Sequence, residues 1–324
     1  MDVVGTYFCL NDFPISALIW LYITILLYSS AKPHGIDIFM SYDLNYLCLC
    51  FHDDDLLIIV SVYSFIEYQS LAFTLRRGIQ MSFRLGLCSI SFRKNTPEEI
   101  LQAMKAAELS VIEWGSDVHC PPHQAKEIAE QQKQYGIQCC SYGTYFRLAV
   151  TPICELDAYI KAAKTLGTDV LRLWCGNKNS EDYSAEQRAF LFDACKAATK
   201  IAEAEGVILC MECHNQTYTN SKEAALELMQ AVASKHFRMY WQPNQLRSVA
   251  ENLDYAKTLA PYTQNIHVFN WKANEKHPLC EARGVWRQYL ANFRDSHALL
   301  LEFMPDGKIE TLKTEADALK EIAK

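Results

Sequence analysis

From residue 84 to the end of the chain, short apolar runs alternate with longer segments whose apolar positions recur at helical spacing. The short runs predict buried strands at 84–92, 111–114, 137–142, 170–174, 207–212, 237–241, 265–269 and 298–303. The longer segments predict a helix that begins at Thr96, and further helices at 123–135, 155–166, 184–205, 221–234, 249–259, 285–293 and 312–324. Thr96-Pro-Glu-Glu99 is typical of a helix start. A glycine directly follows three of the predicted helices, as helix ends favour: Gly136, Gly167 and Gly206.

Eight strand–helix units therefore fill the 244 residues of 81–324. Strict alternation implies a parallel sheet with right-handed crossovers. Eight units at this length predict a (β/α)8 TIM barrel, because such barrels typically have about 250 residues. A doubly wound open sheet is the alternative, but Ser89-Ile-Ser-Phe92 stands where a dinucleotide fold would have a glycine-rich turn.

The first 80 residues have a different character. They hold three basic residues, Lys32, Arg76 and Arg77, against eight acidic ones, and no apolar period defines an element. Ile15–Tyr28 is apolar but short for a bilayer, and no Lys or Arg precedes it as in a signal peptide. We expect 1–80 to be a poorly structured N-terminal extension, disordered or not native, with Met81 as the natural start. The competing interpretation is a membrane anchor built on Ile15–Tyr28.

Composition narrows the class of protein further. Half of the 324 residues are hydrophobic and the net charge is -7, so no basic excess suggests a nucleic-acid partner. The 13 cysteines are odd in number and many lie in apolar runs, which favours reduced thiols in a cytoplasmic protein. Cys210 and Cys213 form a CxxC, but three positions apart on a strand they point to opposite faces, which argues against a zinc knuckle or a redox pair. A membrane partner is not expected, and a homo-oligomer is left open.

Polar residues stand at the carboxyl ends of the last four predicted strands: Glu212, Gln242, His267 and Glu302. In a barrel, sites lie at that end of the strands. Alternation places Glu212 and Glu302 on the inward faces with the apolar residues two positions earlier. Two carboxylates, an imidazole and an amide oxygen suit one divalent metal, Mn2+, Mg2+ or Co2+, with Zn2+ as a further option. The alternatives are a core histidine at 267 and a simple ion pair between Glu302 and Arg172.

Four fragments, in this order and spacing, carry a resemblance to a known family: Ile112-Glu113-Trp114, Met211-Glu212-Cys-His214, Asn265-Ile-His267-Val268 and Leu301-Glu302-Phe303. They resemble the xylose isomerase-like TIM barrels, or AP endonuclease family 2, whose members are also described as sugar phosphate isomerases/epimerases. The resemblance covers roughly 84–324 and implies that Glu212, His267 and Glu302 are metal ligands.

The sixth strand departs from the family pattern. The family has Asp and, three residues later, His, where this chain has Gln242 and Gln245; Asn270 likewise replaces an Asp after the strand-seven histidine. An amide oxygen can bind a metal but carries no charge. The formal charge of the ligand set therefore falls from -3 to -2, and we expect the metal to be bound weakly.

The resemblance implies metal-assisted proton transfer beside the carbonyl of a small-molecule sugar or sugar phosphate, that is, an isomerase or epimerase. Glu212 and Glu302 would serve as base and acid. Substrate contacts are expected from Glu113, Arg172, Trp174, His214, Gln245 and Lys272.

Other functions stay open on the same fold. An inosose-type dehydratase begins with the same proton abstraction, and a non-catalytic sugar-binding barrel would explain Gln242. Endonuclease IV-like DNA repair is disfavoured, because it uses several zinc ions with many His and Asp ligands. Strands three and four offer Tyr142 and Trp174 instead, and the domain lacks a basic face.

Overall fold

The computed structural model describes residues 36–41, 46–51, 57–61, 83–293 and 298–324. The chain divides into two units, Met1–Gln80 and Met81–Lys324. In the first unit, β1 (Ile36–Ser41), β2 (Tyr46–Phe51) and β3 (Leu57–Ser61) form a three-stranded antiparallel sheet in that order. The sequence pattern did not predict this sheet. Ile15–Tyr28 lies outside the described residues, and the exclusion of 1–80 from the working domain stays a prediction.

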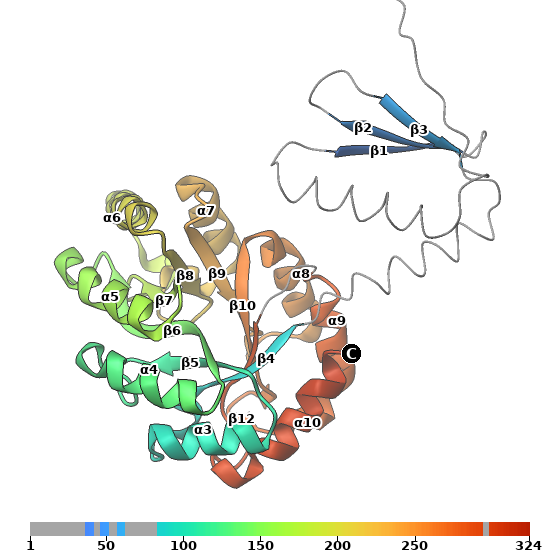
Figure 1. The fold of residues 1–324 in the computed structure, drawn as a ribbon. Coiled ribbons are helices and arrows are strands. Elements are labelled where there is room, and N and C mark those ends of the chain that lie inside the picture. The colour runs from blue at the N-terminus through green and yellow to red at the C-terminus, as the bar shows by residue number, and fades with distance from the viewer. Residues whose placement is uncertain (1–35, 42–45, 52–56, 62–82, 294–297) are drawn as a thin grey trace, which may run out of the picture. The chain divides into compact units, whose positions relative to one another are not determined.

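The second unit is a closed barrel of eight strands, in the order β10-β13-β4-β5-β6-β7-β8-β9. Every neighbouring pair in it is parallel. The strands are β4 (Arg84–Cys88), β5 (Val111–Gly115), β6 (Gln138–Leu148), β7 (Val170–Cys175), β8 (Ile208–Glu212), β9 (Phe237–Trp241), β10 (Thr263–Val268) and β13 (Ala298–Leu301). This confirms the predicted (β/α)8 fold (Figure 1).

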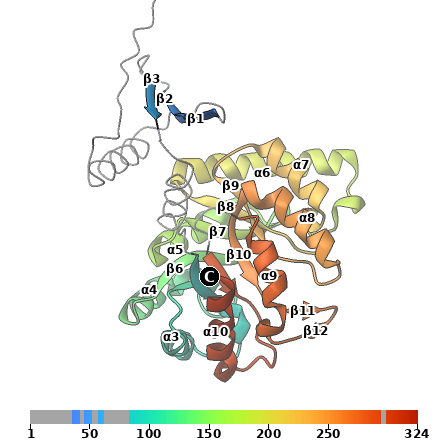
Figure 2. The same cartoon turned by 90° about the vertical axis from the view of Figure 1, so that its right-hand side faces the viewer.

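In the described part of the second unit, eight α-helices surround the strands (Figure 2). They are α3 (Pro97–Ala106), α4 (Ala125–Gln134), α5 (Leu156–Leu166), α6 (Ala185–Glu205), α7 (Lys222–Val232), α8 (Val249–Leu259), α9 (Arg283–Leu290) and α10 (Leu312–Ile322). The expected start of α3 is present, because the Thr96 and Glu99 side chains each accept a hydrogen bond from the other residue's backbone N–H. Gly206 ends α6 with a left-handed φ of 68°, and β8 follows directly. No helix within the described segments has the length and apolar character that a bilayer crossing requires.

Two apolar layers hold the barrel together. The smaller one contains only strand residues and fills the barrel interior: Val111, Cys140, Val170, Cys210, Tyr240, Ala298 and Leu300. The larger one packs the outer faces of the strands against the helices and includes Cys213. Cys210 and Cys213 therefore lie on opposite faces, as expected. Cys210 and Leu300 also fix the inward direction of the residues two positions further on, Glu212 and Glu302.

Three local features differ from the predicted elements. β4 stops at Cys88 and continues as a 3-10 helix, Ser89–Phe92, in which the Ser89 hydroxyl accepts a hydrogen bond from the Gly115 N–H at 2.8 Å. β6 extends to Leu148, beyond the predicted end at residue 142. A short hairpin of β11 (Trp271–Lys272) and β12 (Glu275–Lys276) follows β10. The remaining 3-10 turns are Pro122–Gln124, Ile153–Glu155, Ser180–Asp182, Tyr218–Asn220, Ala260–Tyr262, Leu279–Ala282 and Ile309–Thr311.

Candidate active site

A cavity of about 210 Å³ opens at the carboxyl ends of the barrel strands. Its lining includes four of the strand-end residues singled out in the sequence: Arg172, Glu212, Gln242 and Glu302. Pockets for drug-sized ligands have roughly 300–1,000 Å³. This cavity is smaller and therefore suits a small molecule, of the size of a single sugar.

The four predicted metal ligands meet around one nitrogen atom. His267 Nδ1 lies 3.0 Å from Gln242 Oε1, 3.3 Å from Glu302 Oε2 and 3.8 Å from Glu212 Oε1. These residues belong to β8, β9, β10 and β13 or directly follow them, and the four strands are consecutive in the barrel. Nitrogen and oxygen ligands of one ion, each about 2.1 Å from it, lie roughly 3.0–3.5 Å apart. The distances of Gln242 and Glu302 from His267 Nδ1 therefore fit ligands of one divalent metal, and Glu212 lies slightly outside this range.

The amide of Gln242 is oriented for ligation. Its Nε2 donates to the Cys213 carbonyl oxygen at 3.0 Å, which turns Oε1 toward His267. The amide oxygen, rather than the NH2 group, therefore faces the candidate metal position.

A buried ion-pair network lies beside this cluster. Arg172 Nε donates to Glu113 Oε1 at 2.8 Å, and its Nη1 donates to Glu212 Oε2 at 2.6 Å. The three side chains are at most 5% exposed. Trp174 Nε1 also donates to Glu212 Oε2. Gly143 on β6 leaves room for the pair, since a Cβ there would be 2.7 Å from Arg172 Nη2 and from Glu113 Oε1.

Arg172 keeps both of its carboxylate partners ionised. Burial alone would raise the pKa of Glu113, but the charges of Arg172 and His267 outweigh it and hold that pKa well below its usual range. The pKa of Glu212 is lowered in the same way, against the effect of burial, by Arg172, His267 and His214. Glu212 is therefore fixed in position and charge, with Oε1 turned toward His267.

The pKa values of Glu302 and His267 are raised, in contrast to the lowered values of Glu113 and Glu212. Burial, together with the nearby charge of Glu212, raises the pKa of Glu302 to about 7. Burial would lower the pKa of His267, but Glu302, Glu113 and Glu212 raise it to about 9. Without a metal, the His267 imidazole is therefore protonated at neutral pH, and an incoming metal must displace that proton.

The predicted substrate-binding residues divide into two groups. Trp174, His214 and Gln245 line the cavity, as does Arg172. The His214 ring stacks on Trp174, with centroids 4.9 Å apart and an interplanar angle of 19°.

Glu113 and Lys272 lie outside the cavity lining, so the geometry does not support the expected substrate contacts from them, which stay a prediction. Glu113 is fully buried below the cavity floor and holds Arg172 instead. Lys272 has a side chain that is 62% exposed and contacts Glu281 at 3.4 Å. Its position on a hairpin strand turns it toward solvent, because neighbouring Trp271 takes the inward face.

Several residues that line the cavity or lie beside it were not predicted from the sequence. Tyr145 lies on the unpredicted extension of β6, Trp271 on the hairpin, and Phe303 follows Glu302 with a left-handed φ of 60°. Cys88 ends β4 beside Glu113 and His267. The predicted first strand runs to Phe92, so the end of the predicted strand did not point to Cys88, where β4 stops.

The fold and the site together define a (β/α)8 barrel with a candidate metal centre at its carboxyl end. A sequence model of the family described as "Xylose isomerase-like TIM barrel" matches residues 101–298, more than half of the chain. The chain belongs to this family. No curated protein sequence matches it.

Solved structures share the fold at low sequence identity. A probable 3-DHS dehydratase from Bacillus anthracis is 16% identical, with a TM-score of 0.63 over 74% of this chain and 99% of its own. The IOLI protein, solved with a bound zinc atom, is 15% identical, with a TM-score of 0.58 over 74% and 96%. A D-psicose 3-epimerase from Clostridium cellulolyticum H10, solved with D-tagatose, is 13% identical, with a TM-score of 0.55 over 74% and 97%.

Proposed function

We propose that the protein is a metal-dependent isomerase or epimerase that acts on a small sugar. The observation that carries this proposal is the convergence of Glu212, Gln242 and Glu302, which line the cavity, on the buried imidazole of His267. A divalent ion held by these residues would supply charge stabilisation to the oxyanion that develops when a carbonyl-bearing substrate loses a proton.

Glu212 and Glu302 are the residues that would move the proton. Glu212 ends β8 and Glu302 directly follows β13, β9 and β10 separate these two strands, and both side chains line the cavity. One carboxylate takes a proton from the carbon beside the carbonyl, and the electron pair moves into the carbonyl group. The other carboxylic acid returns a proton. Return to the opposite face of the same carbon gives an epimer, and return to the former carbonyl carbon gives the aldose–ketose isomer.

The charge of the cavity favours an unphosphorylated sugar. Among the described residues that line it, Arg172 is the one Lys or Arg, and both Glu113 and Glu212 already engage its guanidinium. A phosphate would therefore find no uncommitted cation there. The aromatic residues Trp174, Phe269 and Trp271 instead offer apolar faces to the carbon side of a sugar ring.

Structural relatives support this class of substrate. The epimerase structure contains D-tagatose, and the IOLI structure contains zinc. The relative described as a probable 3-DHS dehydratase makes elimination a second candidate, because elimination also starts with proton removal beside a carbonyl.

A turnover screen tests the proposal. The full chain, loaded with Mn2+, Co2+ or Zn2+, is incubated with ketoses, aldoses and their phosphates, and the products are separated chromatographically. An isomer or epimer of an unphosphorylated sugar is the expected product. A product lighter by one molecule of water would show that the protein is a dehydratase instead. Saturable sugar binding without any product would show that the protein is a non-catalytic sugar-binding barrel.

Replacing Gln242 by Asp is expected to tighten Mn2+ binding by about tenfold, because it adds a carboxylate beside a dication in a buried site. Titration calorimetry on the wild type and the variant measures the change. Gln242→Glu is the matched control. It also adds charge, but it places a carboxylate oxygen where Nε2 now donates to the Cys213 carbonyl, so its gain should be smaller. Unchanged affinity in Gln242→Asp would mean that residue 242 is not a ligand.

A further inference from the structure

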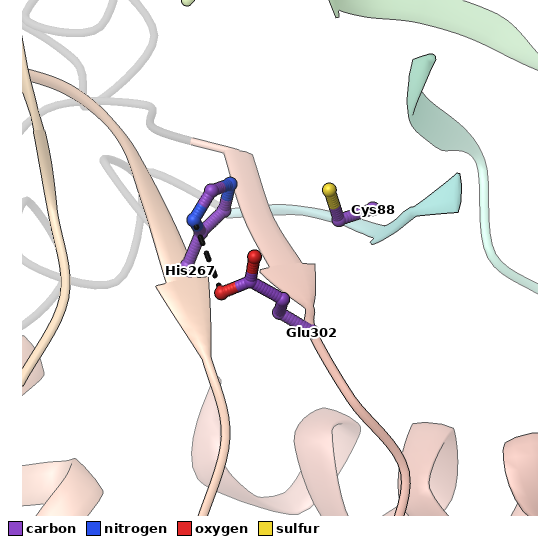
Figure 3. Close-up of side chains that lie close together, drawn as sticks. All are labelled: Cys88, His267 and Glu302. Atoms are coloured by element: carbon purple, nitrogen blue, oxygen red, sulfur yellow. Dashed lines mark ion pairs between the residues drawn. The ribbon is translucent and has the colours of Figure 1, made fainter. Parts of the chain in front are cut away.

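We propose that Glu113 is a positioning residue of the metal centre: it accepts a hydrogen bond from the Nε2–H of His267 and so leaves Nδ1 of that ring free to bind the ion. This inference rests on the proposed metal-dependent function, and Glu113 acts on the ion through His267 without touching it. The two nitrogens lie on opposite sides of the imidazole ring. Figure 3 shows that one of them faces Glu302, whereas the other is turned away from that carboxylate, toward Cys88 on β4.

The Nδ1 side of the ring holds the other candidate ligands. Gln242 Oε1, Glu302 Oε2 and Glu212 Oε1 lie 3.0, 3.3 and 3.8 Å from Nδ1. A neutral imidazole binds a metal through the nitrogen that carries no proton. A ring that binds through Nδ1 therefore keeps its proton on Nε2. Because a buried N–H without an acceptor is costly, the Nε2 side needs a hydrogen-bond acceptor.

Glu113 is placed to be that acceptor. Both His267 and Glu113 are fully buried, and Glu113 Oε1 lies 3.5 Å from His267 Nε2. Among the described residues, neither His267 Nε2 nor Glu113 Oε2 has a regular hydrogen-bond partner. An approach of a few tenths of an ångström brings the two side chains within the usual hydrogen-bond range, up to about 3.2 Å. A donor and an acceptor that are both buried and unsatisfied thus lie beside each other, and each can supply the partner that the other lacks.

Arg172 fixes Glu113 in this position. Its Nε donates to Glu113 Oε1 at 2.8 Å, and its Nη1 donates to Glu212 Oε2 at 2.6 Å. The Cys88 thiol donates to the same Glu113 Oε1 at 3.2 Å, so that both neighbours leave Oε2 available to His267. One guanidinium therefore ties the carboxylate behind His267 to a carboxylate of the proposed ligand set. A carboxylate that accepts from the second N–H of a ligating histidine orients the ring and raises its affinity for the metal.

Metal affinity gives the first test. Glu113→Gln keeps the size of the side chain but removes its charge, and Arg172 keeps Glu212 as an ion-pair partner. We expect Zn2+ to bind this variant about ten- to a hundredfold more weakly than the wild type, as measured by titration calorimetry on the metal-free full chain. Ser141→Ala is the matched control. Ser141 is also buried and pairs with Glu113 in register between β5 and β6, but it carries no charge, so its variant should bind Zn2+ like the wild type.

The protonation of the His267 ring gives a readout that a purely structural role of Glu113 would not change. The full chain is labelled with nitrogen-15 histidine and loaded with Zn2+, which is diamagnetic. The signals of His267 are those absent from the spectrum of His267→Asn, and long-range proton–nitrogen couplings show which ring nitrogen carries the proton. We expect the proton on Nε2, at the low field typical of an N–H bonded to a carboxylate. It should move upfield in Glu113→Gln and stay in place in Ser141→Ala.

Three results would overturn the inference. A proton on Nδ1 in the Zn2+-loaded wild type would mean that the ion binds through Nε2, and it would also contradict the proposed ligand set. Wild-type Zn2+ affinity in Glu113→Gln would show that Glu113 does not support the site. Weaker binding with an unshifted Nε2 proton would show that the effect passes through Arg172 to Glu212 instead. In the last two cases the proposed isomerase stands.

Two further outcomes are also decisive. Absence of Zn2+ binding to the wild type would remove the inference and the metal-dependent function together. If Glu113→Gln fails to fold, the wild-type spectrum decides. An Nε2 proton at the field of an N–H without a hydrogen bond would then overturn the inference, and a proton at low field would support it.

Discussion

Replacing Glu302 by glutamine is expected to lower turnover by about a thousandfold, the usual contribution of a positioned acid or base, while the barrel stays folded. Glutamine keeps the size of the side chain but cannot exchange a proton. Glu302 lies 3.3 Å from His267 Nδ1, and it is not one of the two carboxylates that pair with Arg172. The variant should therefore leave the buried ion-pair network intact. Steady-state kinetics and thermal unfolding of the same preparation measure both parts of this prediction.

Glu315→Gln is the matched control for Glu302→Gln. Glu315 is also a buried carboxylate, but it lies on α10 and accepts a hydrogen bond from the Leu279 N–H, away from the cavity. Its variant should keep wild-type turnover. Activity in Glu302→Gln above a tenth of wild type would exclude Glu302 as an essential proton carrier.

Replacing Arg172 by methionine is expected to reduce the free energy of unfolding by about 3–5 kcal/mol, because it leaves two buried carboxylates without their cation. Glu113 and Arg172 are at most 2% exposed, and Glu212 is 5% exposed at its side chain, so water cannot replace the lost partner. Urea denaturation at neutral pH measures the change.

Two further variants separate this effect from lost packing. Arg172→Met combined with Glu113→Gln should recover part of the loss, since one of the stranded charges is removed. Arg188→Met breaks a surface pair with Glu227, in which both side chains are nearly half exposed, and should cost no more than about 1 kcal/mol. If Arg172→Met costs as little as Arg188→Met, the buried network does not stabilise the fold.

The buried ion-pair network also affects how Glu212 should be substituted. From its position at a strand end, outside the core, Glu212 would be expected to tolerate a substitution without loss of the fold. Glu212, however, is 3% exposed and bound to Arg172, and Glu212→Ala would strand a buried guanidinium on one side. Glu212→Gln is the better variant for testing function, because it keeps an acceptor for Arg172 Nη1.

The barrel could be predicted from the sequence because its determinants are local. Apolar strands, capped helices such as α3 and glycine stops such as Gly206 each follow from a few neighbouring residues. The strand-end rule then places Glu212, Gln242, His267 and Glu302 at one end without further information.

Long-range partners could not be predicted in this way. The pairing of Arg172 with Glu113 and Glu212 joins residues 59 and 40 positions apart, and it turns an expected substrate ligand into a buried support. The hairpin at β11 and β12 is too short to show a period, so the outward direction of Lys272 was not visible. Cys88 was missed because a cysteine in an apolar run is typical of a core residue.

The central claim is that this site moves a proton beside a sugar carbonyl with the help of a divalent metal. The most direct measurement is incorporation of deuterium from D2O into unphosphorylated ketoses, followed by mass spectrometry after removal of the protein. The metal-loaded wild type should introduce deuterium at a carbon beside the carbonyl, and both removal of the metal and Glu302→Gln should stop it. Sugar that binds to the metal-loaded protein without gaining any deuterium would contradict the claim.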